Sequence, residues 1–267
     1  MRDPIDPAWF QPVHRKSWVV SLFSLYVRRM LGRSFCAVHV HRDSLPKAAG
    51  PGRPGVVFLN HASWWDPLVM LWASRILFPD ASGYAPIEAA QLSRYAFFRW
   101  LGLFAVRGAS PGGARDFLRA VERILTTPGA MLWITPEGRF VDVRERPVRF
   151  SSGLAHAAVR HPGASFVPLA VEYTFKKERL PEIFLRFGTV QTGRVWGSSV
   201  EEAKSRMEDG LRQTEDSLAE DVIAGRRDQF NRLFSGASGT AFPYDGWRRA
   251  RAWVRGERIE LNHSVDL

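Results

Sequence analysis

The sequence predicts an α/β fold in which a mostly parallel central sheet has helices on both faces. Two observations support this prediction. Short apolar segments of strand length alternate with longer segments whose apolar residues recur at helical spacing. Strands separated by helices of this length pair in parallel, and both faces of such a sheet are covered. Functional residues are then expected in loops at the carboxyl ends of strands.

The chain has 267 residues, of which 45% are hydrophobic, so it is long enough for one substantial core. We expect one α/β domain with additions at both ends. The predicted parts are an amphipathic, membrane-associating helical segment over residues 1–34, the α/β domain over 35–200, and a helical, basic C-terminal extension of the same domain over 201–267.

The N-terminal segment is expected to contain an interfacial helix. Apolar residues recur at helical spacing within Trp9–Leu31, flanked by arginine and lysine. A helix packed on the main domain fits this pattern equally well. The apolar run Ser17–Val27 is well below the ~20 residues that a spanning helix needs. Arg28 and Arg29 follow it where a signal peptide would have small residues, so we expect the segment to be retained in a peripheral protein.

The remaining elements follow in order along the chain. Phe35–His41 alternates like a strand, and after a Pro/Gly loop Gly55–Leu59 has the composition of a short buried strand. Further strands are expected at 83–86, 103–107, 130–135, 165–174 and 183–190. Helices are expected at about 67–78, 88–101, 112–126 and 152–160, and from Glu201 the pattern is helical and charged. The stretch from Trp247 to Arg255 is basic and aromatic.

Charge and cysteine content narrow the possible functions. Lys and Arg number 37 against 27 Asp and Glu, which gives a net charge of +10 and favours anionic partners such as nucleic acid, anionic lipid or a phosphorylated cofactor. The single cysteine, Cys36, excludes an intrachain disulfide and a cysteine-built zinc site. The histidine spacing does not resemble a zinc motif, so no metal is expected.

The first candidate catalytic pair follows the strand that ends at Leu59. His61 lies in the loop Asn60–Asp66, and Asp66 with Pro67 forms a good helix start. A loop of this length can bring the Asp66 carboxylate to the His61 ring, which makes a general base with its orienting carboxylate. The alternative is that Asp66 only caps the helix and His61 is an ordinary loop residue.

A second candidate group follows the strand at 130–135. Glu137, Gly138 and Arg139 suit a polar, phosphate-bearing acceptor, because arginine forks onto phosphate and glycine permits close approach. Glu137 would hold hydroxyls or Arg139 itself. An ordinary polar turn with a surface ion pair is the alternative.

Four blocks together resemble the glycerolipid acyltransferases typified by 1-acylglycerol-3-phosphate acyltransferase. The blocks are Asn60–Asp66, the segment Gly102–Gly108, Pro136–Arg139, and Val167-Pro168. In the second block Phe104-x-x-Arg107 corresponds to the end of the family's Gly-x-x-Phe-x-x-Arg block. The resemblance covers roughly residues 35–190, and four ordered blocks are more specific than one motif.

The resemblance implies catalysis by His61 with Asp66, and acceptor binding by Arg107, Glu137, Gly138 and Arg139. It implies acyl-CoA or acyl-carrier protein as co-substrate, with no further cofactor. His61 would deprotonate the acceptor hydroxyl as it attacks the thioester, and Arg107 or loop N–H groups would stabilise the oxyanion. Membrane lipids and an anionic membrane surface are the expected partners, on the cytoplasmic face of the cell membrane.

Two departures from the family pattern leave the acceptor open. Arg139 follows Gly138 directly and Phe140 comes next, where the family usually has Thr or Ser before the arginine. The sequence has Phe150-Ser151-Ser152-Gly153 where the family commonly has Phe-Lys-x-Gly. The acceptor is therefore lysophosphatidate, another lysophospholipid, or a glycolipid or pigment hydroxyl without phosphate.

Three other classes of function each fit part of the sequence. The segment Gly108–Gly112 matches a serine-hydrolase elbow, but Pro111 has no N–H for an oxyanion hole. A nucleic-acid-binding protein fits the net charge but shows no binding motif, so nucleic acid is an unlikely partner. A membrane-docked protein that keeps the fold without activity is the third alternative.

Overall fold

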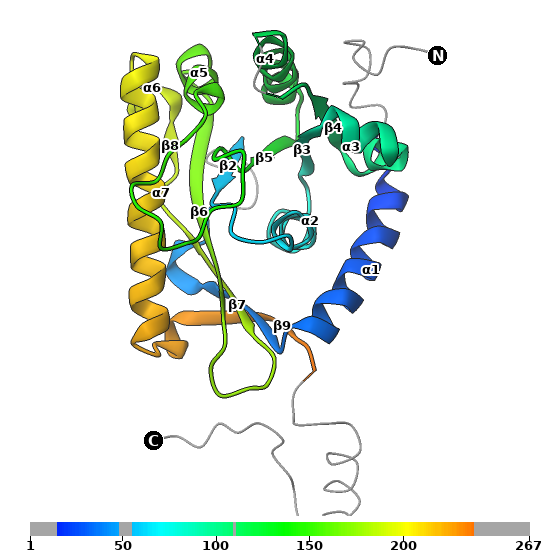
Figure 1. Ribbon diagram of the computed structural model, residues 1–267, viewed down its shortest axis with the longest axis vertical. Helices are drawn as coiled ribbons and strands as arrows, with labels where there is room; N and C mark the ends of the chain where they lie inside the picture. Colours follow the sequence, from blue (N-terminus) through cyan, green and yellow to red (C-terminus); the bar gives the residue numbers. More distant parts are fainter. Residues whose placement is uncertain (1–14, 48–54, 109–110, 238–267) are drawn as a thin grey trace, which may run out of the picture.

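The computed structural model describes residues 15–47, 55–108 and 111–237, and within them nine strands form one sheet (Figure 1). The strand order is β4-β3-β5-β2-β6-β7-β1-β9, with β8 paired to β6 outside this path. The strands are β1 (Ala37–His41), β2 (Val56–Leu59), β3 (Ser82–Glu88), β4 (Leu103–Val106), β5 (Ala130–Ile134), β6 (Ser165–Thr174), β7 (Glu182–Phe187), β8 (Gln191–Thr192) and β9 (Phe230–Ser235).

The larger part of the sheet is parallel. Strands β4, β3, β5, β2 and β6 pair in parallel, β7 runs antiparallel to β6, β1 is parallel to β7, and β9 is antiparallel to β1. The mostly parallel α/β sheet expected from the sequence is confirmed. Because β2 and β5 are parallel neighbours, the loops after Leu59 and Ile134 leave the same edge of the sheet side by side.

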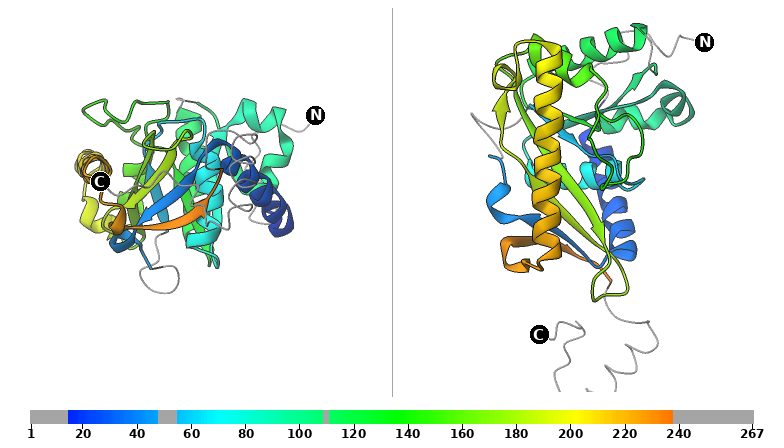
Figure 2. Two further views of the ribbon diagram at one scale, coloured as in Figure 1. Left: turned by 90° about the horizontal axis from the view of Figure 1, so that it is seen from below. Right: turned by 60° about the vertical axis from the view of Figure 1, so that its left-hand side comes forward.

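Helices cover both faces of this sheet. They are α1 (Ser17–Ser34), α2 (Asp66–Leu77), α3 (Ala89–Arg94), α4 (Pro111–Thr126), α5 (Gly153–Arg160), α6 (Gly193–Trp196) and α7 (Val200–Ile223). Short 3-10 turns add η3 (Arg42–Ser44), η4 (Ala96–Leu101) and η5 (Arg227–Gln229). Helix α7 runs along the sheet on the side opposite α1 (Figure 2).

Successive side chains of a strand point to opposite faces of the sheet, and each face has its own apolar cluster. In β2, Val57 and Leu59 join the apolar cluster that contains α1 and α2. Val56 and Phe58 join the cluster that contains α4, α5 and α7. All four side chains are fully buried, so β2 is apolar throughout, as a strand covered on both faces must be.

Strand β6 carries a proline although it lies inside the sheet. Its first half is parallel to β2 and its outer side meets β8 only at Ser165 and Phe166. Pairing with β7 begins at Leu169. Pro168 therefore lies between the residues that pair with β8 and those that pair with β7. Its missing N–H costs no hydrogen bond to either of these two strands.

Three elements differ from the expectations. The helix expected at 88–101 is split at Tyr95 into α3 and η4, and the turn ends at Gly102, whose φ of +98° favours glycine. The strand expected at 183–190 ends at Phe187. The expectation of a helical segment throughout 201–267 is wrong for Phe230–Ser235, which forms the edge strand β9 with the loop-like polarity of Asn231 and Arg232. The short elements β8 and α6 were not predicted either.

Some expectations fall outside the described residues. These are the start of the N-terminal helix before residue 15, the loop at 48–54, part of the Gly108–Gly112 pattern, and the C-terminal stretch that includes Trp247–Arg255. None of the helices in the described part of the chain has the length and apolarity to cross a bilayer.

Candidate active site

The loop that carries His61 starts from a fixed point at the end of β2. The Asn60 side chain accepts a hydrogen bond from the Val171 N–H at 2.8 Å and donates one to the Val171 carbonyl at 3.0 Å. This buried amide bonds β6 as a peptide group would, one residue beyond the last β2–β6 pair at Leu59. The loop therefore leaves the sheet from a defined place.

Asp66 orients the His61 ring. The His61 Nδ1 lies 2.8 Å from the Asp66 Oδ2, and Asp66 is fully buried. Carboxylate oxygens accept hydrogen bonds, so this contact favours the tautomer in which Nδ1 donates and Nε2 is the acceptor. The His61 side chain keeps 18% of its surface exposed, which leaves the ring accessible from outside.

Two further donors satisfy the Asp66 carboxylate. The Ser63 N–H donates to Oδ2 at 2.9 Å, and the Tyr173 hydroxyl donates to Oδ1 at 2.6 Å. From its sequence position, Asp66 could have served only as the cap of α2. In the structure the N-cap is Trp65, and the Asp66 carboxylate instead turns back toward its own loop and the His61 ring. A buried carboxylate with three donors is well compensated for the loss of water.

Tyr173 is a site residue that the sequence analysis missed. Burial raises the pKa of its phenol well above 10, and the neighbouring Asp66 carboxylate raises it further, so the hydroxyl stays protonated as a donor. Tyr173 lies on β6, where alternation from Val167 through Val171 places it on the face that holds α2. That alternation could have placed Tyr173 on this face from the sequence. It could not have shown that Asp66 is the partner of its hydroxyl.

The segment after β5 holds the His61 backbone from both sides. The His61 N–H donates to Glu137 Oε2 at 2.7 Å, and the Val141 N–H donates to the His61 carbonyl at 2.9 Å. The Phe140 ring packs 4.3 Å from the His61 ring. Gly138 makes the turn possible with a φ of +67°. Glu137 thus bonds the backbone of the loop that carries His61, a partner that was not predicted from the sequence.

Glu137 itself is an unusual carboxyl group. Burial raises its pKa above the ordinary value, and this outweighs the lowering by the His61 N–H bond and by the charges of His61 and Arg139. The Glu137 carboxyl is thus partly enclosed by the protein where it accepts the His61 N–H.

The two candidate phosphate-binding arginines are each paired with a carboxylate. Arg139 donates to Glu145 at 2.6 Å and is 62% exposed. Arg107, after β4, donates to Asp116 of α4 at 3.0 and 2.6 Å. In the strand order, β3 and β5 separate β4 from β2. The structure therefore brings His61, Asp66 and Glu137 together, whereas Arg107 follows a strand that β3 and β5 separate from β2.

The surroundings of the His61 ring are apolar and aromatic. Trp64 is 63% exposed and Phe140 is 57% exposed. The Trp64 ring packs against Trp65, which in turn contacts Phe35 at the end of α1. Phe140 therefore gives the His61 ring an exposed aromatic neighbour, and Trp64 exposes a second ring from the same loop as His61. A histidine with an apolar neighbour suits a hydroxyl carried on a lipid.

Comparison with known proteins gives the family and the fold of the chain. A family model described as Acyltransferase matches residues 37–172, just over half of the chain. The structure titled 1-acyl-sn-glycerophosphate (LPA) acyltransferase, PlsC, from Thermotoga maritima is similar with a TM-score of 0.52 and 18% sequence identity, covering 76% of this chain and 80% of that chain. At this identity the likeness shows a shared fold. No curated protein sequence matches.

Proposed function

Because the chain belongs to the acyltransferase family, we propose that it moves a fatty acyl group from a thioester onto a hydroxyl of a glycerolipid, with His61 as general base. The observation that carries this proposal is the 2.8 Å contact between His61 Nδ1 and the fully buried Asp66 carboxylate. The contact fixes the tautomer in which Nε2 can accept a proton.

The proposed step forms one ester bond and breaks one thioester bond. Nε2 of His61 takes the proton of the acceptor hydroxyl while that oxygen attacks the thioester carbonyl. The thiolate leaves and receives the proton from the imidazolium, which Asp66 has stabilised. The attacking oxygen belongs to the substrate, so no acyl-enzyme forms. Acyl-CoA or acyl-carrier protein supplies the thioester, and no further cofactor enters.

A phosphate on the acceptor can compete for the candidate arginines. The Arg139–Glu145 pair is exposed, with 62% and 47% of the two side chains accessible. Exposed pairs of this kind contribute little to stability, so a phosphate can displace the carboxylate. A lysophospholipid would then place its phosphate near Arg139, with Gly138 permitting close approach and Arg107 as the second candidate.

A neutral acceptor is the second candidate substrate, and one contact favours it. Phe140 packs on the His61 ring and remains 57% exposed, so an apolar ring lies at the position next to the base. A glycolipid or pigment hydroxyl would pack there without requiring a free cation. A panel of acceptors separates the two candidates.

The test is an assay of purified protein with acyl-CoA or acyl-carrier-protein donors and a panel of lysophospholipid and neutral acceptors. The His61→Ala variant should lose roughly 10²-fold or more of the turnover, since it lacks the general base. His156→Ala, a histidine on α5, is the matched control and should keep full activity. Near-normal turnover in His61→Ala would refute the assignment.

We also propose that α1 docks the protein on the cytoplasmic face of an anionic membrane. Val20, Val27 and Leu31 bury one side of the helix in the core. The opposite side exposes Trp18, Leu22, Leu25 and Tyr26, each more than half accessible. Arg28, Arg29 and Arg33 lie in the C-terminal half of the same helix. Together with Phe234 they line a hollow of about 450 Å³. An apolar stripe followed by arginines suits acyl chains and phosphate headgroups.

Vesicle flotation tests this docking. Wild-type protein should float with vesicles containing phosphatidylglycerol, and Leu22→Glu should reduce the bound fraction severalfold. Ser21→Glu adds the same charge at an exposed position beside the stripe and is the control. Removing Met1–Arg33 is a poorer test because Val27 and Leu31 are core residues. Unchanged flotation of Leu22→Glu would contradict the proposal. Binding of the wild-type protein to DNA as tight as its binding to the vesicles would also contradict it.

A further inference from the structure

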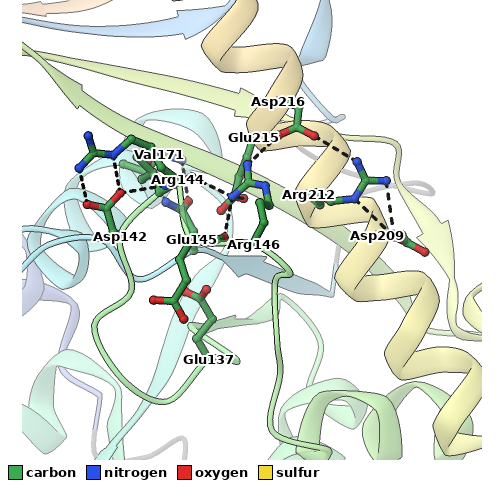
Figure 3. Close-up of polar contacts among 12 residues, drawn as sticks. Glu137, Asp142, Arg144, Glu145, Arg146, Val171, Asp209, Arg212, Glu215 and Asp216 are labelled. Atoms are coloured by element: carbon green, nitrogen blue, oxygen red, sulfur yellow. Dashed lines mark hydrogen bonds and ion pairs between the residues drawn. The ribbon is translucent and has the colours of Figure 1, made fainter.

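A long loop between β5 and α5, residues 135–152, reaches both the His61 site and α7. Its first part supplies the three contacts to His61 described above. Its second part lies against α7, where Figure 3 shows the Arg146 side chain between the loop and the helix. The base of the loop is closed by the Ser151 N–H, which donates to the Pro136 carbonyl at 2.9 Å.

Arg146 holds the loop and the helix at the same time. Its guanidinium donates to Asp216 of α7 at 2.6 Å and lies 3.3 Å from Glu215. It also donates to the carbonyls of Val143 at 2.8 Å and Glu145 at 2.9 Å. The planar Arg146 guanidinium has its N–H donors in fixed directions, so these bonds together hold the loop in one conformation against α7.

The α7 side of this contact is itself well held. Arg212 donates to Asp216 at 3.1 Å from one turn away, so Asp216 is oriented before it meets Arg146. A second anchor lies further along, where the Phe150 N–H donates to the buried Glu208 carboxylate at 2.7 Å. Helix α7 is fixed in turn by its packing on the sheet.

The same loop carries the His61 contacts and the α7 contact. Glu137 and Val141 bond the His61 backbone. A few residues later the Val143 and Glu145 carbonyls accept from Arg146, which donates to Asp216 of α7. The α7 contact and the His61 backbone are therefore joined through one short stretch of chain.

We propose that Arg146 is a positioning residue for the acyl transfer, acting through the loop 135–152 by its contact with Asp216 and Glu215. The proposal rests on the proposed function of His61. Arg146 touches no reacting atom. It fixes the loop on α7, so that Glu137 and Val141 hold the His61 backbone and Phe140 lies against the ring. A displacement of about 1 Å at reacting groups can lower a rate by ~10²-fold, so a contact this remote can control turnover.

The experiment compares Arg146→Gln with Arg144→Gln. Arg144 lies in the same loop, pairs with Asp142 and is 85% exposed, so it is a control for loss of a loop arginine without loss of the α7 contact. Arg146→Gln should lower kcat at least about tenfold, with the KM for the thioester within about twofold. Arg144→Gln should keep the wild-type kcat. Arg146→Lys, which retains the charge, should recover part of the loss.

A spectroscopic measurement separates this proposal from the proposed function. The ring signals of His61 in ¹H–¹⁵N NMR should shift in Arg146→Gln and stay in place in Arg144→Gln, whether or not an acceptor has been found. Asp216→Asn should reproduce the effect with Arg146 intact, and it decides the matter if Arg146→Gln fails to fold. Unchanged kcat and His61 signals in Arg146→Gln and Asp216→Asn would overturn the proposal, as would an equal effect of Arg144→Gln.

Discussion

Replacing Glu215 by glutamine is expected to stabilise the folded protein at alkaline pH. Glu215 is 7% exposed, and its Oε2 has no hydrogen-bond partner among the described residues. Arg146 lies 3.3 Å away but makes its 2.6 Å bond to Asp216, so the geometry of an ion pair here does not imply a well-stabilised carboxylate. We therefore regard Glu215 as largely a neutral acid at pH 7, in agreement with its pKa of about 8.

The size of the effect follows from that pKa. A carboxyl pKa raised from 4.5 to about 8 in the folded state corresponds to roughly 5 kcal/mol as an upper value, at ~1.4 kcal/mol per pKa unit. The folded state binds the proton more tightly than the unfolded state. The stability contributed by this proton is therefore complete below about pH 4.5 and is lost as the pH rises through 8.

Urea denaturation of wild type and Glu215→Gln at pH 5, 7 and 9 measures this effect. The variant should gain stability relative to wild type as the pH rises, by a few kcal/mol between pH 5 and pH 9. Glu220→Gln, at an exposed position of the same helix, is the matched control and should follow the wild-type curve. Parallel stability curves for wild type and Glu215→Gln would show that burial does not raise this pKa as reasoned.

Three further predictions concern single side chains. Asp66→Asn should lower kcat by roughly 10²–10⁴-fold with the fold unchanged in circular dichroism, because an amide no longer fixes the His61 tautomer; activity within tenfold of wild type would contradict this. Tyr173→Phe should reduce the free energy of unfolding by about 1–3 kcal/mol in urea denaturation, since a buried Asp66 oxygen loses its donor. Burial raises the pKa of Cys36 to about 11, so at pH 8 a thiol reagent should label folded protein at least about 100-fold more slowly than unfolded protein, and equal rates would contradict the burial.

The sequence predicted most of the sheet because local pattern and tertiary role agree there. Val56–Leu59 is apolar at every position, and in the structure both of its faces are buried. The split at Tyr95 escaped prediction because a run of aromatic residues satisfies helical spacing whether or not the helix is continuous. Strand β9 escaped it because an edge strand exposes polar residues such as Arg232.

For the candidate site, sequence reasoning identified groups near each other along the chain. His61 and Asp66 are five residues apart, and the helix start at Asp66-Pro67 made their contact possible but left the cap-only alternative open. The three later blocks favoured the pair, and the structure shows the contact. Tyr173 is 107 residues from Asp66, so its bond depends on strand order that no local pattern reveals. The partner of Glu137 was missed for the same reason, since the His61 N–H becomes available only when β2 and β5 are neighbours.

The strand β6 has a consequence for how the chain can be divided. The family match ends at residue 172, inside β6, but the outer side of this strand pairs with β7 from Leu169 onward. Strand β1 pairs only with β7 and β9 among the described strands, and both come later in the chain. A fragment limited to 37–172 would hold His61 and Asp66, yet it would present an open β6 edge and a β1 segment with no partner. Because open edges can pair with other chains, we expect such a fragment to aggregate. The segment that matches the family is thus shorter than the sheet to which it contributes.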